Sequence, residues 1–310
     1  MLLAAPSAAL WLSAQGRLGA EGFVPHGAGF LAALENWWRA EGCVPAPTDE
    51  PGTGGDALRF AGGWALFLGY ELASEIEPQL ALPRTPLPWQ AFALRTPCAL
   101  VHDLRRRRVC IVAEAQASEA MERVAADAQA AAAHEQESED GLRIEQVREE
   151  EPAAYLARVQ RAKEYVRAGD IYQANLSRPW EVEVSASATE PAPAAALYRR
   201  LCAANPAPFA ALAQWRGVAI LSSSPERLVR VVGRAVDTRP IAGTRPRSRR
   251  PGGDHAEMSE LAAHPKERAE HIMLIDLERN DLGRVCEAGS VRVDEFMTIE
   301  SYTHVHHIVS

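Results

Sequence analysis

The sequence of 310 residues lacks any long apolar run, and none approaches the roughly 18 consecutive apolar residues that a membrane-spanning helix needs. Residues 2–12 are largely apolar, but no basic segment precedes them and Pro6 interrupts them, which argues against a secretory signal. The sequence therefore predicts a cytoplasmic protein with no membrane partner.

Closely spaced cysteines and an excess of positive charge are also missing. The five cysteines are odd in number and never form a CxxC pair, which favours reduced thiols over a disulfide framework or a zinc site. They are Cys43, Cys98, Cys110, Cys202 and Cys286. The net charge of −8 disfavours nucleic acid or an anionic membrane as the main partner. A small anionic ligand remains compatible with this charge, because local fields decide its binding.

What is present is an ordinary globular composition, with 47% hydrophobic and 24% charged residues. The length exceeds that of a typical single domain. Residues 134–151 are acidic and poor in apolar side chains, as is typical of a linker. We therefore predict two subdomains, residues 1–145 and 146–310. Predicted strands and helices come in groups rather than in strict alternation, which favours an α+β fold.

The pattern of apolar residues predicts these elements. In the first part we expect a loop over 43–56 and a helix over 29–39 with Phe30, Leu31, Leu34 and Trp38 on one side. Further elements of that part are a buried strand over 60–70, a short helix over 71–76, strands over 91–102 and 108–114, and a helix over 115–133. In the second part we expect helices over 152–168, 192–204 and 264–284, and strands over 171–180, 209–215, 218–222, 227–232, 236–240, 291–296 and 302–309.

The helix over 264–284 carries two carboxylates of interest. Glu267 and Glu270 stand three residues apart, so both project from nearly the same face. One interpretation is a solvated acidic face bridged by Lys266, Arg268 and His271. The other is half of an oxygen-rich site for a hard divalent cation, most plausibly Mg²⁺.

Polar groups at the ends of predicted strands supply further candidates. Glu226 follows an apolar strand and is expected to be a partly buried acid that protonates a leaving hydroxyl. The stretch 240–244 ends a strand in a glycine turn, where backbone N–H groups and the Thr244 hydroxyl could bind a carboxylate. The alternatives are a polar turn and a hairpin corner. A zinc pair at His304 and His306 is a weaker hypothesis, because no cysteine lies close and no third ligand is evident.

Five ordered motifs give the sequence a specific resemblance to a family. They lie at residues 169–178, 223–226, 240–247, 266–285 and 299–310. Together they resemble the chorismate-utilising enzymes, which include anthranilate synthase component I and aminodeoxychorismate synthase component I. Residues 1–145 match more loosely, chiefly through 62–70. The resemblance implies a two-subdomain α+β fold, with antiparallel sheets forming a β-sandwich core flanked by helices.

The resemblance also implies roles for individual residues. Glu267 and Glu270 would help to hold Mg²⁺ against the ring carboxylate of chorismate, and Glu226 would be the general acid. His307 would lie beside the enolpyruvyl side of the ring. Gln173, Ala242, Gly243 and Thr244 would line the substrate site. Gln173 stands where water-adding relatives carry a general-base lysine, so the expected nucleophile is ammonia supplied by a glutamine amidotransferase subunit.

Two branches of the family use ammonia, and the motifs are closer to the aminodeoxychorismate branch. The Leu-Leu-Glu-Ser element of many anthranilate synthases is also missing. Against this, Ala242 stands where some aminodeoxychorismate synthases carry a nucleophilic lysine, and alanine cannot form a covalent adduct. We expect amination at C4 on the way to 4-aminobenzoate and folate. Anthranilate synthesis is the alternative.

The family pattern continues beyond Ser310, with a Ser-Gly-Ala-Pro-Lys element, a second glutamate pair and an arginine and a tyrosine that grip substrate. These elements are not in the sequence. The resemblance therefore implies that the last strand lacks ladder partners and that the 310-residue polypeptide by itself is inactive and poorly folded. A non-catalytic remnant of the fold, which at most docks an amidotransferase, is the alternative of another class.

Overall fold

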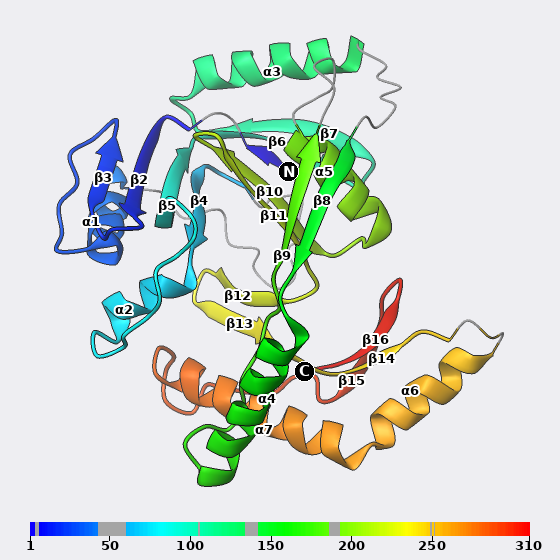
Figure 1. Cartoon of the computed structure of the whole chain (residues 1–310). Coiled ribbons are helices and arrows are strands. Elements are labelled where there is room, and N and C mark those ends of the chain that lie inside the picture. Colours follow the sequence, from blue (N-terminus) through cyan, green and yellow to red (C-terminus); the bar gives the residue numbers. More distant parts are fainter. Residues whose placement is uncertain are drawn as a thin grey trace. The chain divides into compact units, whose positions relative to one another are not determined.

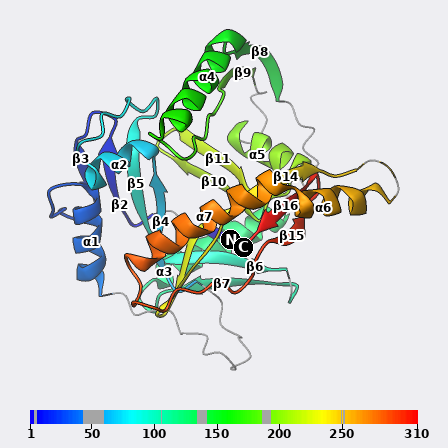
Figure 2. The same cartoon turned by 90° about the horizontal axis from the view of Figure 1, so that it is seen from below.

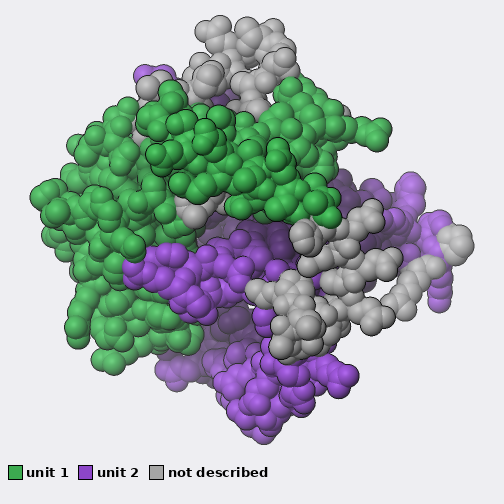
Figure 3. Space-filling model, turned by 90° about the horizontal axis from the view of Figure 1, so that it is seen from above, with its two compact units in different colours: residues 1–136 green, residues 137–310 purple. Residues whose placement is uncertain are grey.

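The computed structural model describes residues 1–3, 6–42, 60–104, 106–133, 142–185, 193–248, 250 and 252–310. The chain forms two compact units, Met1–Gln136 and Glu137–Ser310 (Figure 3). The units divide after Gln136, whereas the sequence-based boundary was placed after residue 145. The loop expected over 43–56 lies outside the described residues. Among the described helices, none has the length and apolar character needed to cross a membrane.

Unit 1 is built on a four-stranded antiparallel sheet in the order β3-β2-β5-β4 (Figure 1). Its strands are β2 (Ala8–Ser13), β3 (Leu18–Glu21), β4 (Gly63–Leu68) and β5 (Trp89–Thr96). A second sheet has the order β1-β6-β7, with β1 (Leu2–Leu3), β6 (Cys98–Asp103) and β7 (Arg108–Ala113). The helical elements are α1 (Phe30–Glu41), the 3₁₀ turn η1 (Tyr70–Leu72), α2 (Ala73–Ile76) and α3 (Ser118–Ala133).

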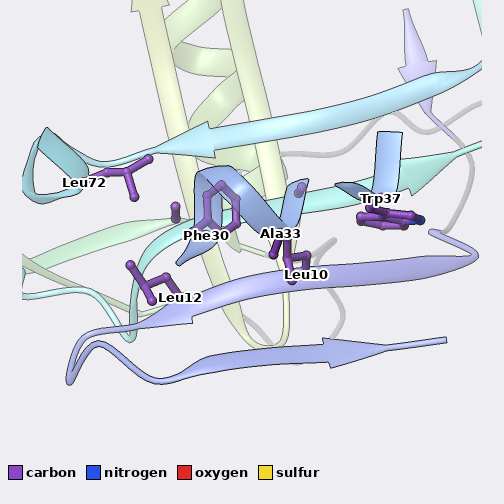
Figure 4. Packing of buried hydrophobic residues seen from close by; sticks show 8 residues of the cluster. Leu10, Leu12, Phe30, Ala33, Trp37 and Leu72 are labelled. Atoms are coloured by element: carbon purple, nitrogen blue, oxygen red, sulfur yellow. The ribbon is translucent and has the colours of Figure 1, made fainter. Parts of the chain in front are cut away.

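The core of unit 1 lies between α1 and the four-stranded sheet (Figure 4). Its buried residues are Leu10, Leu12, Phe30, Ala33, Trp37, Leu72, Ala91 and Ala93. The helix is where the sequence predicts it, and three of the four residues expected on one side, Phe30, Leu31 and Leu34, pack in or against the core. The fourth, Trp38, is 53% exposed, and Trp37 is buried instead, at 5%. The buried residues Phe30, Ala33 and Trp37 follow the spacing of one helical face.

Two predicted strands of unit 1 differ from those in the structure. The single strand expected over 91–102 is divided at Pro97 into β5 and β6, which belong to different sheets. Proline lacks the N–H that a continuous ladder needs. The strand expected to be buried, β4, lies at the edge of its sheet and leaves Leu66 and Leu68 about half exposed.

A carboxylate distant in sequence caps the N-terminus of α1. The Phe30 and Leu31 N–H groups donate to the two oxygens of Glu75, at 2.7 and 2.9 Å. Such N–H groups have no partner within their own helix, and a negative charge there also complements the helix dipole. Gly29 leaves the room, since a Cβ at Gly29 would lie 2.7 Å from the same carboxylate.

Replacing this cap is expected to destabilise the protein moderately. Glu75→Ala should lower the free energy of unfolding by roughly 1–2 kcal/mol, because two N–H groups lose their acceptor. Chemical denaturation followed by circular dichroism measures the change. Glu77→Ala is the control, since within the described residues the Glu77 side chain accepts from Gln79 on the surface and caps no helix. Equal midpoints for the two variants would contradict the capping role.

Unit 2 consists of antiparallel sheets and four helices within its described residues. The two-stranded sheets pair β8 (Arg143–Glu149) with β9 (Trp180–Ser185), β10 (Phe209–Trp215) with β11 (Val218–Ser224), and β12 (Arg227–Val232) with β13 (Ala235–Arg239). A three-stranded sheet has the order β14-β16-β15, with β14 (Ile241–Pro246), β15 (Thr298–Ser301) and β16 (Val305–Val309). The helices are α4 (Pro152–Ala168), α5 (Pro193–Ala204), α6 (Gly253–Ala263) and α7 (Pro265–Gly283).

Three predictions for unit 2 are wrong. The C-terminal part of the expected linker is the strand β8, whose Ile144 and Val147 pair with Val184 and Val182 of β9. The strand expected over 171–180 is absent, and pairing begins only at Trp180. Residues 291–296 form no strand, and β15 follows them instead. Each short apolar run is ambiguous by itself, because partner strands decide whether it joins a ladder.

The three-stranded sheet and the helices beside it bring the candidate residues together. The last strand, β16, pairs with β14 on one edge and with β15 on the other, so the prediction that it lacks ladder partners is wrong. Helices α6 and α7 pack against β14 (Figures 1 and 2). Buried residues from these elements include Ala242, Leu261, His271, Ile275, His306, His307, Ile308 and Val309.

Candidate functional site

The first turns of α7 hold the two glutamates singled out in the sequence. Pro265 occupies the first helical turn, where its missing N–H costs nothing. The Glu267 and Glu270 side chains are 13% and 30% exposed. The helix packs on β14 along this face, so Glu267 is not on a solvated acidic face. The metal interpretation of the pair stays a prediction.

Each carboxylate has its own compensating partner. The Arg245 guanidinium lies 3.1 Å from Glu267 Oε1, and the Arg245 side chain is only 22% exposed. Gln173 Nε2 donates to Glu270 Oε1 at 3.2 Å, and Lys266 Nζ lies 3.7 Å from the other oxygen. Two neighbouring like charges repel unless something compensates them, and these contacts supply that compensation.

Residues 241–244, expected to end a strand in a glycine turn, are instead part of the strand β14, which has an irregular register with the facing strand β16. These two strands form the next part of the site. Thr244 Oγ1 and His307 Nδ1 are 2.9 Å apart and come from paired positions of the two strands. Gly243 has φ +95°, and a Cβ there would lie 2.9 Å from Ile308 Cδ1. A glycine is therefore required at this close approach on both conformational and steric grounds.

Glu226 joins this group from the loop between β11 and β12. Its Oε1 accepts the Ile241 N–H at 2.8 Å, and its charge acts on His307. The residue is exposed, so the predicted partial burial is wrong. Glu226 lies between two strands and not within one, so the alternation of buried and exposed residues along a strand does not predict its exposure.

His307 lies in a polar but largely water-free setting, with 8% exposure. Burial lowers its pKa, and the charges of Glu226 and Glu300 oppose this effect. Glu300 itself accepts from the Tyr302 hydroxyl and from Arg239. Burial acts to raise the pKa of Glu300, but these two donors lower it below its usual range. Burial therefore favours the neutral form of the His307 imidazole.

The burial of His307 predicts a pH dependence of stability. An unfolded imidazole takes up a proton near its ordinary pKa of about 6.5, whereas folded His307 does so only at lower pH. The unfolded state thus binds more protons, so the free energy of unfolding should fall as the pH drops below about 6.5. Buried His271 adds an effect of the same sign. Urea denaturation at about pH 7.5 and about pH 5.5 measures the loss. A loss just as large in His307→Asn would contradict this cause.

All eight predicted site residues lie in unit 2, and hydrogen bonds join two pairs of them, Gln173 with Glu270 and Thr244 with His307. Glu267 is near Gly243, since a Cβ on that glycine would lie 3.4 Å from Glu267 Oε2. Ala242 is buried, and its carbonyl accepts from a helix α7 side chain, His271. The predicted residues are Gln173, Glu226, Ala242, Gly243, Thr244, Glu267, Glu270 and His307. Their roles in chemistry stay predictions, while their proximity is a property of the fold.

The weaker zinc hypothesis finds no support in the geometry. His304 precedes β16, is exposed and contacts the Ala204 carbonyl, so it does not share a strand face with His306. His306 is 1% exposed and pairs with the Ser301 hydroxyl. Over the part of the chain that the structure describes, no three His, Cys, Asp or Glu side chains gather as a metal cluster.

Two residues that the sequence did not single out as site residues belong to this group. Arg245 lies within the motif over 240–247 and pairs with Glu267. His271 was considered only as a bridge on a solvated face, yet it is fully buried. Its position four residues after Glu267 puts both side chains on one helix face, which was the available signal.

The glutamate pair can supply two carboxylates to a hard cation. Mg²⁺ prefers oxygen ligands and is commonly bound through one or two carboxylates, with waters and substrate oxygens completing its shell. Glu267 and Glu270 fit this mode, whereas a full protein cage is not formed by the described residues. A separate cavity of about 920 Å³ adjoins the C-terminal half of α7, and none of the predicted site residues lines it. The candidate site is therefore defined by the contacts among its side chains and not by this cavity.

The chain is similar to several known proteins. A family model described as chorismate binding enzyme matches residues 35–310. The chain is 37% identical over 290 residues to anthranilate synthase component 1 of Cereibacter sphaeroides, covering 87% of this chain and 55% of that protein. It is 47% identical over 152 residues to aminodeoxychorismate synthase component 1 of Bacillus subtilis, covering 49% of this chain and 31% of that protein. The chain thus spans about half, or less, of the length of these relatives.

A solved structure shows the same fold. The crystal structure of anthranilate synthase component I from Streptococcus pneumoniae matches with a TM-score of 0.77 at 24% identity, covering 99% of this chain and 67% of that one. This likeness confirms the predicted α+β fold class.

Proposed function

Because the chain belongs to the chorismate binding enzyme family, we propose that it acts in the Mg²⁺-dependent amination of chorismate by ammonia. We place the amination at ring C4, which gives 4-amino-4-deoxychorismate for 4-aminobenzoate and folate synthesis. The observation that carries the proposal is the Gln173 amide on Glu270 Oε1. An amide cannot abstract a proton from water, so the position favours a nucleophile that needs no activation.

The side chains of unit 2 then have defined tasks. Glu226, as a carboxylic acid, gives its proton to the departing ring hydroxyl, so that water leaves as the C–N bond forms. The Thr244 hydroxyl and the turn at Gly243 bind the ring carboxylate. Neutral His307 contacts the enolpyruvyl side. Bound through Glu267 and Glu270, Mg²⁺ would neutralise the substrate carboxylate and the charge that develops at the ring.

A glutamine amidotransferase subunit is the proposed source of ammonia. The support is indirect: two of the similar proteins carry "component 1" in their names, which implies a second component in those systems. Free ammonium at high concentration should therefore replace the partner in assays, which separates the chemistry on chorismate from docking of the partner.

Anthranilate synthesis is the second candidate, and two observations favour it. Ala242 cannot act as a nucleophile, and the relative that covers 87% of this chain is named anthranilate synthase component 1. In that reaction amination occurs at C2 and pyruvate is released.

Separating the products decides between the candidates. The protein is incubated with chorismate, Mg²⁺ and ammonium, and the products are resolved by liquid chromatography with mass detection. A product that keeps the enolpyruvyl group supports C4 amination. Anthranilate with equimolar pyruvate would show the second candidate. Chorismate left unconsumed by the folded protein would favour the non-catalytic alternative.

The proposed metal site predicts that removing the positively charged Arg245 side chain increases the affinity for a divalent metal ion. Arg245→Met is expected to tighten Mn²⁺ binding roughly five- to tenfold, because Glu267 no longer has to leave an ion pair of about 1 kcal/mol. Electron paramagnetic resonance of Mn²⁺ measures this without turnover. Arg268→Met removes the same charge from α7, but the only contact described for that side chain is with the Ala262 carbonyl. Equal affinities of the two variants would contradict competition between Arg245 and the metal.

A further inference from the structure

His271 is a fully buried imidazole at the centre of the candidate site. It lies on α7 directly after Glu270 and one turn after Glu267, with 0% exposure. A buried imidazole must satisfy both ring nitrogens or lose stability. Both nitrogens are satisfied here, and by groups from two other segments of unit 2.

The partners of His271 fix the direction of every hydrogen bond. Nδ1 lies 3.0 Å from the Ala242 carbonyl oxygen, which can only accept, so Nδ1 carries the proton. In the neutral ring Nε2 is then an acceptor, and the Ser310 hydroxyl, 2.6 Å away, donates to it. That hydroxyl oxygen in turn accepts the Met297 N–H at 2.9 Å. Burial lowers the pKa of His271, and the bond to Ala242 partly opposes this effect.

The bond to Ala242 also orients the next peptide group. In a trans peptide the C=O and the following N–H point in opposite directions. Since the Ala242 carbonyl points to α7, the Gly243 N–H points away from that helix. The β14–β16 register is irregular between Ile241 and Thr244, so the ladder alone does not hold this peptide in a regular position.

We propose that His271 is a positioning residue that sets the orientation of the Ala242–Gly243 peptide and holds it against the helix of Glu267 and Glu270. The consequence for binding rests on the proposed function: the oriented Gly243 N–H is one of the donors to the substrate carboxylate. His271 touches no substrate in this arrangement. It acts through the backbone of β14 at Ala242, two residues before Thr244, whose hydroxyl contacts His307.

The first experiment does not depend on the proposed function. The full chain is labelled with ¹⁵N at histidine, and long-range ¹H–¹⁵N correlation spectra distinguish the two neutral tautomers. The expected result is a neutral ring with the proton on Nδ1. A proton on Nε2 would overturn the proposal, because the Ala242 carbonyl would then face a bare nitrogen. His271→Leu assigns the resonance.

The second experiment separates positioning from stability. His271→Asn carries an amide near the Nδ1 position and keeps a donor for Ala242, whereas His271→Gln reaches the Nε2 position and keeps the Ser310 contact. We expect both variants to unfold at lower urea concentration. Only His271→Gln should raise KM for chorismate, roughly tenfold, with kcat changed less than about threefold. Ser310→Ala, the control for stability, should leave KM near that of the native protein.

The outcomes are distinguishable from failure of the proposed function. If KM rises equally in His271→Asn and His271→Gln, or follows stability across all three variants, His271 is only structural and the proposal is wrong. If the native protein does not bind chorismate, the proposed function fails. Hydrogen exchange of residues 241–244 then tests His271, with faster exchange expected in His271→Gln than in His271→Asn. Equal exchange rates would overturn the proposal.

Discussion

In an enzyme that carries the whole family pattern, Glu270→Gln is expected to lower Mg²⁺-dependent consumption of chorismate by two to three powers of ten, or about 3–4 kcal/mol, because a metal carboxylate is lost. The amide keeps the shape of the side chain and an acceptor for Gln173. It does not keep the charge that a hard cation requires. The fold should be retained, because the Glu270 side chain is 30% exposed and lies in the N-terminal part of α7. Steady-state rates over a range of Mg²⁺ concentrations measure the effect.

The metal dependence identifies the cause of this loss. Part of the activity of Glu270→Gln should return at high Mg²⁺, because weakened binding is offset by mass action. Glu260→Gln on the neighbouring helix α6 is the matched control, since it removes an exposed carboxylate that is outside the site. Full activity of Glu270→Gln at saturating metal, with normal metal affinity, would refute the role of Glu270.

Glu226→Gln is expected to lower kcat by roughly 10²–10⁴-fold while changing KM little, because a positioned general acid contributes about that factor. The glutamine oxygen can still accept the Ile241 N–H, so the turn before β14 should be preserved. The reaction then lacks a proton donor for the leaving hydroxyl. Pre-steady-state measurement of chorismate consumption detects the change.

Two observations would separate this effect from that of Glu270→Gln. The loss in Glu226→Gln should not respond to added Mg²⁺, and Mn²⁺ affinity should equal that of the native protein. Glu181→Gln on β9 is the control, because that carboxylate is 79% exposed and belongs to a surface pair. A Glu226→Gln variant that keeps native kcat would mean that another group protonates the leaving hydroxyl.

The helices were the most predictable part of this fold. The helix over 152–168 has the predicted bounds in the structure, because Pro152 begins it and Gly169 ends it in a left-handed conformation. Strands were less predictable. Residues 171–179 were expected to pair and do not, while 143–149 were expected to be a linker and pair with β9. Pairing depends on a partner that a single segment does not encode.

The candidate site shows the same division. The residues that match family motifs could be found from their order along the chain, and the family model then matched residues 35–310. Their contacts could not. No spacing rule indicates that Arg245 faces Glu267 or that Gln173, 97 residues before Glu270, donates to it. The exposure of Glu226 also had to be seen in the fold.

The sequence by itself determined that two carboxylates lie one helical turn apart, because a helix fixes the relation of residues three or four apart. It also showed an acid after a predicted strand, and the resemblance to the family implied that Gln173 stands where water-adding relatives carry a base. Only the tertiary structure decided which partners those groups have. It also decided that His271 on α7 is buried and contacts Ala242 and Ser310. Burial and hydrogen-bond direction arise from segments distant in sequence, and they set charge state and orientation.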